Sequence, residues 1–257
     1  MKILITGGNG MVGRNIRQYH LAAEYEILAP SSKELDLLDY ASLDHYIAEN
    51  KPDFVIHCAG RVGGIMANMH AQFDFLYENL EMGKNLVLAL KNNNVKKMLN
   101  LASSCMYPRN AVNPLKESAL LTGELEPTNE GYAIAKIATW KLCQHLSKPE
   151  TGFEFKTIIP CNLYGPYDKF DAHKAHLIPA IIRKVHEAKK QSASSIDVWG
   201  SGNARREFMY VDDLANAVFF CLKNFEKLPL VFNCGTGVDF SINDYYSTTA
   251  KVLGWQG

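Results

Sequence analysis

The sequence opens with the stretch KILITGGNGMVG at residues 2–13, and this stretch decides the fold. A short apolar run of strand length leads directly into Gly7-x-x-Gly10-x-x-Gly13, and a helical pattern follows. The first glycine permits a tight turn, the second lets backbone amides approach a pyrophosphate, and the third allows close helix packing. The helix N-terminus adds partial positive charge. The stretch predicts a dinucleotide-binding unit; the alternative is a glycine-rich turn in an α/β protein that binds no dinucleotide.

Along the rest of the chain, apolar runs of strand length alternate with helical patterns. The runs are apolar on both faces, as expected when helices cover both sides of a parallel sheet. We therefore predict an α/β fold: a doubly wound, Rossmann-type parallel sheet with a smaller C-terminal substrate lobe. Residues 1–160 are assigned to a dinucleotide-binding domain, and residues 161–257 mostly to a substrate-binding lobe interleaved with the sheet. The expected strands are 2–6, 25–29, 53–59, 97–103, 155–160, 196–199 and 230–234, and the expected helices are 11–24, 40–50, 71–93, 130–147, 176–190, 212–224 and 242–253.

The composition argues against several classes of protein. The 257 residues include 27 basic and 27 acidic side chains without a basic block, so a nucleic acid partner is not expected. No window approaches the roughly 18 consecutive apolar residues of a membrane span. The six cysteines are scattered without a Cys-x-x-Cys pair, which indicates neither a metal site nor a disulfide framework. A reducing cytoplasm fits this pattern best.

The second expected strand leads into LAPSSKELDLLD at residues 28–39, which indicates the cofactor. A protein that binds NAD usually carries an acid here for the ribose hydroxyls. Hydroxyl groups and the Lys33 ammonium suit a 2′-phosphate better, so NADP(H) is favoured over NAD(H). Lys33 as a solvated loop residue is the alternative. The predicted cofactor contacts are Gly7, Gly10, Met11, Val12, Gly13, Ser32, Lys33, Asp36, Leu37, Ala59, Tyr132 and Lys136.

The stretch GYAIAK at residues 131–136 places Tyr132 and Lys136 on one helix face, four residues apart. A free tyrosine has a pKa of about 10 and needs a cation or a donor to act as acid or base near neutrality. Lys136 can stabilise the phenolate and reach a cofactor ribose, although an amphipathic helix face gives the same spacing. Ser103 ends the fourth expected strand, where this fold opens onto its ligand crevice. Two hydroxyls on one carbonyl oxygen would stabilise the alkoxide formed by hydride transfer, which predicts a dehydrogenase-type site.

Several further motifs accompany the glycine loop and the Ser, Tyr and Lys residues. The chain resembles the extended short-chain dehydrogenase/reductases and, within them, the family of GDP-L-fucose synthases, the GDP-4-keto-6-deoxy-mannose epimerase/reductases. The similarity extends over nearly the whole chain. Its motifs are RVGGIMAN (61–68), SSCMYP (103–108), EPTNEGYAIAKI (126–137), NLYGPYD (162–168), HLIPA (176–180) and WGSGNARREFMYVDD (199–213).

This resemblance implies an NADP-dependent enzyme that epimerises a GDP-4-keto-6-deoxy sugar at C3 and C5 and then reduces the C4 ketone to give GDP-L-fucose. Ser103, Tyr132 and Lys136 would form the reductase triad, and Cys105 and His176 the acid/base pair for epimerisation. The chemistry is consistent, because a ketone at C4 acidifies both neighbouring carbons and its reduction locks the new configuration. The implied substrate contacts are Ser104, Asn162, Lys184, Trp199 and Arg206. No metal is implied.

Alternative functions remain open on the sequence. A C4 reductase without epimerisation would use the same triad on a GDP-4-keto-6-deoxy-hexose or heptose, and Lys184, where an arginine is familiar, is compatible with a modified sugar. A 4,6-dehydratase fits less well, because Ser104 and Cys105 occupy the place of its Asp-Glu pair. A dinucleotide-sensing regulator would need only the glycine loop. The resemblance also implies a homodimer through helices 71–93 and 130–147, and a lobe without the last segment of the family.

Overall fold

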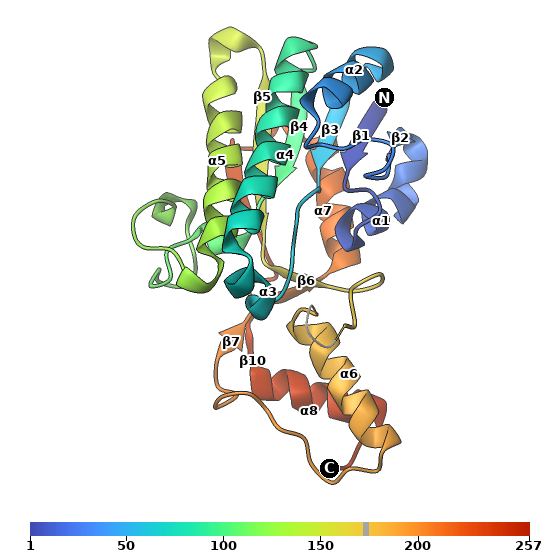
Figure 1. Ribbon diagram of the computed structural model, residues 1–257, viewed down its shortest axis with the longest axis vertical. Coiled ribbons are helices and arrows are strands. Elements are labelled where there is room, and N and C mark those ends of the chain that lie inside the picture. The colour runs from blue at the N-terminus through green and yellow to red at the C-terminus, as the bar shows by residue number, and fades with distance from the viewer. Residues whose placement is uncertain (172–174) are drawn as a thin grey trace.

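The computed structural model describes residues 1–171 and 175–257, and a six-stranded parallel sheet forms its centre (Figure 1). The strand order is β2-β1-β3-β4-β5-β9, and neighbouring strands run parallel throughout. The order reverses at β1, and in such sheets ligands bind at this switch point, beyond the carboxyl ends of the strands. The predicted doubly wound parallel sheet is confirmed. The strands are β1 Lys2–Thr6, β2 Glu26–Leu28, β3 Phe54–His57, β4 Lys97–Leu101, β5 Glu154–Pro160 and β9 Val231–Cys234.

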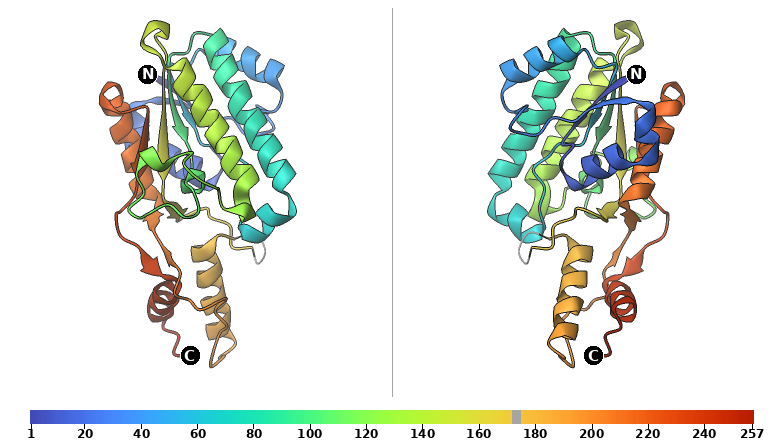
Figure 2. Two further views of the ribbon diagram at one scale, coloured as in Figure 1. Left: turned by 90° about the vertical axis from the view of Figure 1, so that its left-hand side faces the viewer. Right: turned by 90° about the vertical axis from the view of Figure 1, so that its right-hand side faces the viewer.

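Helices cover both faces of this sheet (Figure 2). Successive strand residues point to opposite faces, so Ile3 and Ile5 pack with α1 and α7, while Leu4 packs with α2 and α4. Most positions of the central strands are therefore apolar on both faces, and buried polar exceptions are hydrogen-bonded, as Asn100 is to Thr157 at 3.2 Å. The helices are α1 Met11–Gln18 and α7 Val211–Lys223 on one face, and α2 Tyr40–Asn50, α4 Gln72–Asn92 and α5 Glu130–Leu146 on the other.

A small lobe lies beyond the carboxyl ends of the sheet strands (Figure 1). Its helices α6 Leu177–Lys190 and α8 Ile242–Leu253 pack together, and β7 Arg205–Arg206 pairs with β10 Phe240–Ser241. A second two-stranded sheet, β6 Asn162–Tyr164 with β8 Phe208–Tyr210, lies between the lobe and the large sheet. The chain enters the lobe after β6, returns to the large sheet for α7 and β9, and enters the lobe again at β10.

Some predicted elements differ from the structure. The expected strand 196–199 is wrong, because no strand is formed there and the side chain of Trp199 is 82% exposed. The helix expected over 11–24 ends as α1 at Gln18, and α3 Ile65–His70 is an additional helix. Short 3-10 helices occupy His20–Glu24, Ser104–Met106, Glu117–Ala119, Pro127–Asn129, Pro149–Thr151 and Phe225–Lys227.

Among the residues that the structure describes, no helix is both long and apolar enough to cross a membrane. The same residues contain no group of three or more His, Cys, Asp or Glu side chains that could hold a metal ion. The cysteines are free thiols.

Candidate active site

The loop between β1 and α1 has the geometry of a dinucleotide cradle. Gly7 adopts a φ of +69°, and a Cβ there would lie 2.7 Å from backbone atoms of Ala59 at the end of β3. Gly10 donates from its amide to Gly7 O at 2.9 Å and is the N-cap of α1, without a side chain that caps the helix. A Cβ on Gly13 would overlap Gly7 O. The loop thus packs closely against Ala59 and against its own backbone. The first amides of α1 remain available to a pyrophosphate.

The chain after β2 presents polar groups beside this loop. Ser32 and Lys33 are exposed, as the predicted contact with a 2′-phosphate requires. The carboxylate of Glu34 accepts from the Ser31 amide at 2.7 Å, and this bond lowers its pKa. Leu37 differs from its expected place: its side chain is buried in the core beneath α2 and α4, which disfavours a contact with adenine.

Arg17 is a cofactor candidate that the sequence did not single out. Its guanidinium donates to Asn9 Oδ1 at 2.9 Å and so lies against the glycine loop. A Cβ on the neighbouring Gly8 would lie 2.7 Å from Ala29 Cβ, so this side of the loop also contacts the chain that leads to Ser32. The only signal in the sequence was the spacing of four residues, about one helical turn, between Gly13 and Arg17.

Ser103 stands where β4 ends at the ligand side of the sheet. It is the N-cap of the 3-10 helix Ser104–Met106, and its Oγ accepts from the amide of Cys105 at 3.4 Å. The residue therefore belongs to a short rigid turn, with Ser104 and Cys105 half-buried beside it.

Tyr132 and Lys136 project from α5 toward this turn. Lys136 is 6% exposed, and its Nζ donates to Leu101 O at 3.1 Å, at the end of β4. The same Nζ lies 5.7 Å from the centre of the Tyr132 ring. The Tyr132 ring is half-buried and meets the Phe75 ring edge-on, with the ring centres 6.5 Å apart. The predicted pair therefore lies at the carboxyl end of β4, one turn of helix apart.

The electrostatics of this pair differ from the expectation. Burial, and then the neighbouring Cys105 thiol, raise the pKa of Tyr132 above its usual value. Burial lowers the pKa of Lys136, while Cys105 and Cys58 act in the opposite direction. Loss of water around both groups outweighs the attraction that was expected to favour the phenolate. Tyr132 is therefore a neutral phenol near pH 7, a form that can donate a proton.

Cys105 shares this environment. Burial raises the pKa of its thiol to about 11, and the contact with Ser103 and the charge of Lys136 reduce that effect. The thiol is protonated near neutral pH, so it can serve as an acid, whereas a role as a base would require its proton to be lost before the step. Cys105 thus interacts with Ser103, Tyr132 and Lys136, and we refer to these four residues as the triad cluster.

His176 lies apart from the triad cluster, at the N-cap of α6 in the small lobe. Burial raises the pKa of Asp168, and an amide hydrogen bond from Lys169 and the nearby His176 oppose that shift. Asp168 Oδ2 is buried without a hydrogen-bond partner. Within residues 1–171 and 175–257, no hydrogen bond or ion pair joins His176 to the triad cluster. The two halves of the expected acid/base pair thus come from different parts of the fold.

Apart from Ser104, which lies in the turn after β4, the expected substrate contacts lie on or near the small lobe. Asn162 donates from its amide to Glu207 O at 2.9 Å, and Lys184 donates to Asp197 O. Arg205 is paired with Asp239 at 2.8 Å, whereas no ion pair holds Arg206 among the described side chains. Arg206 is thus the more available guanidinium for a diphosphate. Trp199 is highly exposed on the lobe.

Asn129 is a second candidate that the sequence analysis missed. It directly precedes α5, and its Oδ1 is buried without a hydrogen-bond partner. A buried, unpaired amide oxygen is costly and is often found where a ligand completes the hydrogen bond. Its position one turn before Tyr132, within the EPTNEGY motif, was the available signal.

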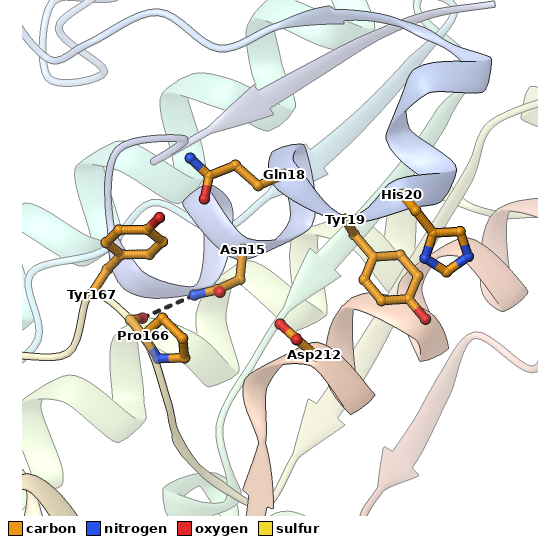
Figure 3. A pocket seen from close by; sticks show the side chains of 7 residues that line it. All are labelled: Asn15, Gln18, Tyr19, His20, Pro166, Tyr167 and Asp212. Carbon is orange, nitrogen blue, oxygen red and sulfur yellow. Dashed lines mark hydrogen bonds between the residues drawn. The ribbon is translucent and has the colours of Figure 1, made fainter.

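A hollow of about 360 Å³ adjoins the site without containing the triad cluster (Figure 3). Asn15 of α1 donates to Pro166 O at 3.0 Å beside it, and Arg14 stacks on the ring of Tyr167 at 4.1 Å. These contacts tie the helix of the glycine loop to the segment that carries Asp168. The hollow is lined by Asn15, Gln18, Tyr19, His20, Pro166, Tyr167 and Asp212.

Comparison with protein families gives a match over residues 3–235 to the model of the NAD dependent epimerase/dehydratase family. The chain belongs to this family. Within it, the chain is 51% identical over 257 residues to a GDP-L-colitose synthase of Yersinia pseudotuberculosis, covering all of this chain and 83% of that relative. It is 45% identical over 256 residues to a GDP-L-fucose synthase of Azorhizobium caulinodans, covering 100% of this chain and 82% of the relative. The relationship that the motifs indicated is confirmed.

Among solved structures, this epimerase/dehydratase family member is similar to a GDP-mannoheptose C4 reductase from Campylobacter jejuni with NADP bound. The TM-score is 0.91 at 32% sequence identity, and the similarity covers 100% of this chain and 86% of that chain. The described chain therefore shares the fold of this solved reductase.

Proposed function

We propose that the protein is an NADP-dependent epimerase/reductase that converts a GDP-4-keto-6-deoxy sugar, in the first instance GDP-4-keto-6-deoxy-D-mannose, to GDP-L-fucose. The observation that carries the proposal is the triad cluster at the carboxyl end of β4, beside the glycine loop, with Cys105 in contact with Ser103. The relatives named as GDP-L-fucose synthase and GDP-L-colitose synthase support the substrate class.

The triad cluster suits reduction of a ketone. NADPH, when bound, supplies the hydride. Tyr132, held neutral by burial, donates its phenolic proton to the carbonyl oxygen as that oxygen gains charge. Ser103 stands one short turn from Cys105 and offers a second hydrogen bond to the same oxygen. Lys136, fixed on Leu101 O, places its ammonium near the phenolate that Tyr132 leaves behind.

Epimerisation precedes reduction in this proposal. The C4 ketone acidifies the hydrogens on C3 and C5, and Tyr132 and Ser103 stabilise each enolate oxygen. Cys105 approaches from the sheet side, and His176 from the lobe side. An acid and a base on different parts of the fold can address opposite faces of one sugar ring, which inversion requires.

For the cofactor we propose NADP(H). Ser32 and Lys33 are exposed at the end of β2, and Arg17 lies against the glycine loop, so these groups can surround a 2′-phosphate. The solved C4 reductase with NADP bound supports this choice. The diphosphate of the GDP sugar would bind at Arg206, whose guanidinium has no ion pair among the described side chains and can recognise phosphate oxygens in a bidentate manner.

We also propose a homodimer in the cytoplasm. On the outer face of α4 and α5, Phe73 is 74% exposed and stacks on Tyr77, and Leu88, Ile134 and Leu142 are also exposed. Two such helix pairs would bury these side chains in a four-helix interface. Free cysteines suit a reducing compartment. Light scattering of the purified protein tests the dimer, and a monomeric mass would reject it.

Two observations favour related substrates as second candidates. The solved GDP-mannoheptose C4 reductase supports a reductase without epimerisation, and the relative at 51% identity supports the 4-keto precursor of GDP-L-colitose. A panel of these GDP-4-keto sugars, with NADPH consumption followed by absorbance, separates the candidates. The proposal predicts that GDP-4-keto-6-deoxy-D-mannose gives the highest kcat/KM and GDP-L-fucose as product. Preference for another sugar of the panel would reject the fucose assignment.

A further inference from the structure

Glu207 lies where the chain crosses between the large sheet and the small lobe. It is the single residue between β7, which belongs to the lobe, and β8, which pairs with β6. A second crossing, residues 235–239, joins β9 of the large sheet to β10 of the lobe. Residues after β6 make a third crossing.

Hydrogen bonds to Glu207 join this first crossing to the second crossing and to β6, the strand that precedes the third. Its Oε1 accepts from the amide of Gly237 at 2.8 Å, from Thr236 Oγ1 at 3.1 Å and from the amide of Thr236. Its backbone oxygen accepts from Asn162 Nδ2 at 2.9 Å, on β6. A Cβ on Gly235 would lie 2.5 Å from Glu207 Oε1, so this turn closely surrounds the carboxylate.

We call Glu207 and its partners Asn162, Thr236 and Gly237 the node. The node lies between two parts of the proposed site, one on the lobe and one on the large sheet. On the lobe side, Arg206 directly precedes Glu207 and pairs with Phe240 across the β7–β10 ladder. On the sheet side, Asn233 Oδ1 accepts from Tyr107 Oη at 2.7 Å, next to the turn that carries Ser103 and Cys105. The chain from Asn233 then leads through three residues to Gly237.

We infer that Glu207 is a positioning residue that fixes the small lobe, and with it Arg206, relative to the triad cluster. The inference rests on the proposed function, because it concerns the distance between the diphosphate and the reacting sugar of that substrate. A carboxylate suits this task, since charged acceptors make stronger hydrogen bonds to amides than neutral ones. Gly237, with a φ of +76°, shapes the turn so that two successive amides point at one oxygen.

The first test measures binding of GDP alone by calorimetry. Glu207→Ala removes the acceptor, while Glu207→Gln keeps an amide oxygen at the same place. Gly235→Ala displaces the carboxylate without removing it. We expect Glu207→Ala and Gly235→Ala to weaken GDP binding about tenfold, because the fraction of molecules with a correctly placed lobe falls by about that factor. Glu207→Gln should restore most of the affinity, and Glu187→Ala, which removes another lobe carboxylate paired with Arg183, should have no effect.

The second test separates positioning from general stability and from the proposed function. NADPH affinity should stay within about twofold in every variant, since the glycine loop is remote from the node. Hydrogen exchange at the amides of Thr236 and Gly237 should accelerate in Glu207→Ala without any ligand. If the wild-type protein binds no GDP, the proposed function is rejected. The hydrogen exchange result then decides alone whether Glu207 holds the two amides in place. Unchanged exchange together with unchanged GDP affinity in Glu207→Ala overturns the inference.

Discussion

Lys136 Nζ donates to Leu101 O at 3.1 Å and lies 5.7 Å from the centre of the Tyr132 ring, so the pair that we propose for proton transfer joins α5 to the end of β4. The hydrogen bond to the strand backbone holds the Lys136 ammonium in one position. Burial raises the pKa of the Tyr132 phenol, so the phenol keeps the proton that the proposed mechanism transfers to a ketone oxygen.

Removal of the Tyr132 hydroxyl group should abolish most of the reductase activity. We expect Tyr132→Phe to lower kcat by about 10²- to 10⁴-fold, the usual contribution of a positioned general acid. NADPH binding, measured by fluorescence titration, should change little. Tyr40→Phe, at the start of α2 and remote from the site, is the matched control. A Tyr132→Phe enzyme with near-normal kcat would show that the phenol is not the donor.

Cys105 and His176 should affect epimerisation separately from reduction. In deuterated water without NADPH, we expect Cys105→Ala and His176→Asn each to slow exchange of the sugar C3 and C5 hydrogens by at least about 10²-fold. Each variant should still bind NADPH, since neither residue touches the glycine loop. Cys221→Ala, which removes a buried thiol on α7, serves as the control. Full exchange in both variants would remove the pair from the mechanism.

Arg17 should contribute to the choice between NADPH and NADH. Its guanidinium lies against the glycine loop at Asn9 Oδ1, and we expect Arg17→Gln to raise the KM for NADPH about tenfold while that for NADH changes little. Arg14→Gln, three residues earlier on α1 and stacked on Tyr167, is the matched control. Equal effects of Arg17→Gln on the two cofactors would indicate a structural role instead.

His57 should make the stability of the protein depend on pH. It is buried beside Thr6, with Nδ1 2.7 Å from Thr6 Oγ1, and burial followed by the charge of Lys136 lowers its pKa from 6.5 to about 3. The unfolded chain takes up a proton below pH 6.5 and the folded chain does not. Above pH 6.5 the protonation of His57 therefore leaves the free energy of unfolding unchanged. Between pH 6.5 and about pH 3 it lowers that free energy by roughly 1.4 kcal/mol per pH unit as the pH falls.

Urea unfolding at pH 7.5 and 5.0 measures this dependence. We expect His57→Gln to show a shallower loss of unfolding free energy between the two pH values than the wild type, whatever its stability at pH 7.5. His186→Gln, an exposed position on α6, should retain the wild-type dependence. Equal pH dependence in His57→Gln and the wild type would contradict the assignment.

Elements with local signals could be predicted from the sequence. The bounds of α8 agree with the prediction, because Ser241 and Asp244 form a capping box at its start and Gly254 ends it with a φ of +64°. The strand expected at 196–199 failed, because strand formation needs a partner and local apolar character cannot supply one.

The site was predictable only in part, for the same physical reason. The spacing of Tyr132 and Lys136 is local, so the helix face they share followed from the sequence. The raised pKa of Tyr132 depends on burial, to which the Phe75 ring contributes, and on the charge interaction with Cys105, and both residues are distant in the sequence. Arg17 and Asn129 were missed because their surroundings, and not their residue types, mark them.

The most direct measurement is deuterium incorporation into the product. The protein, NADPH and GDP-4-keto-6-deoxy-D-mannose are incubated in deuterated water, and the reduced sugar nucleotide is analysed by mass spectrometry and NMR. The account predicts GDP-L-fucose with solvent deuterium at both C3 and C5. A reduced product without solvent deuterium would contradict the epimerase/reductase assignment.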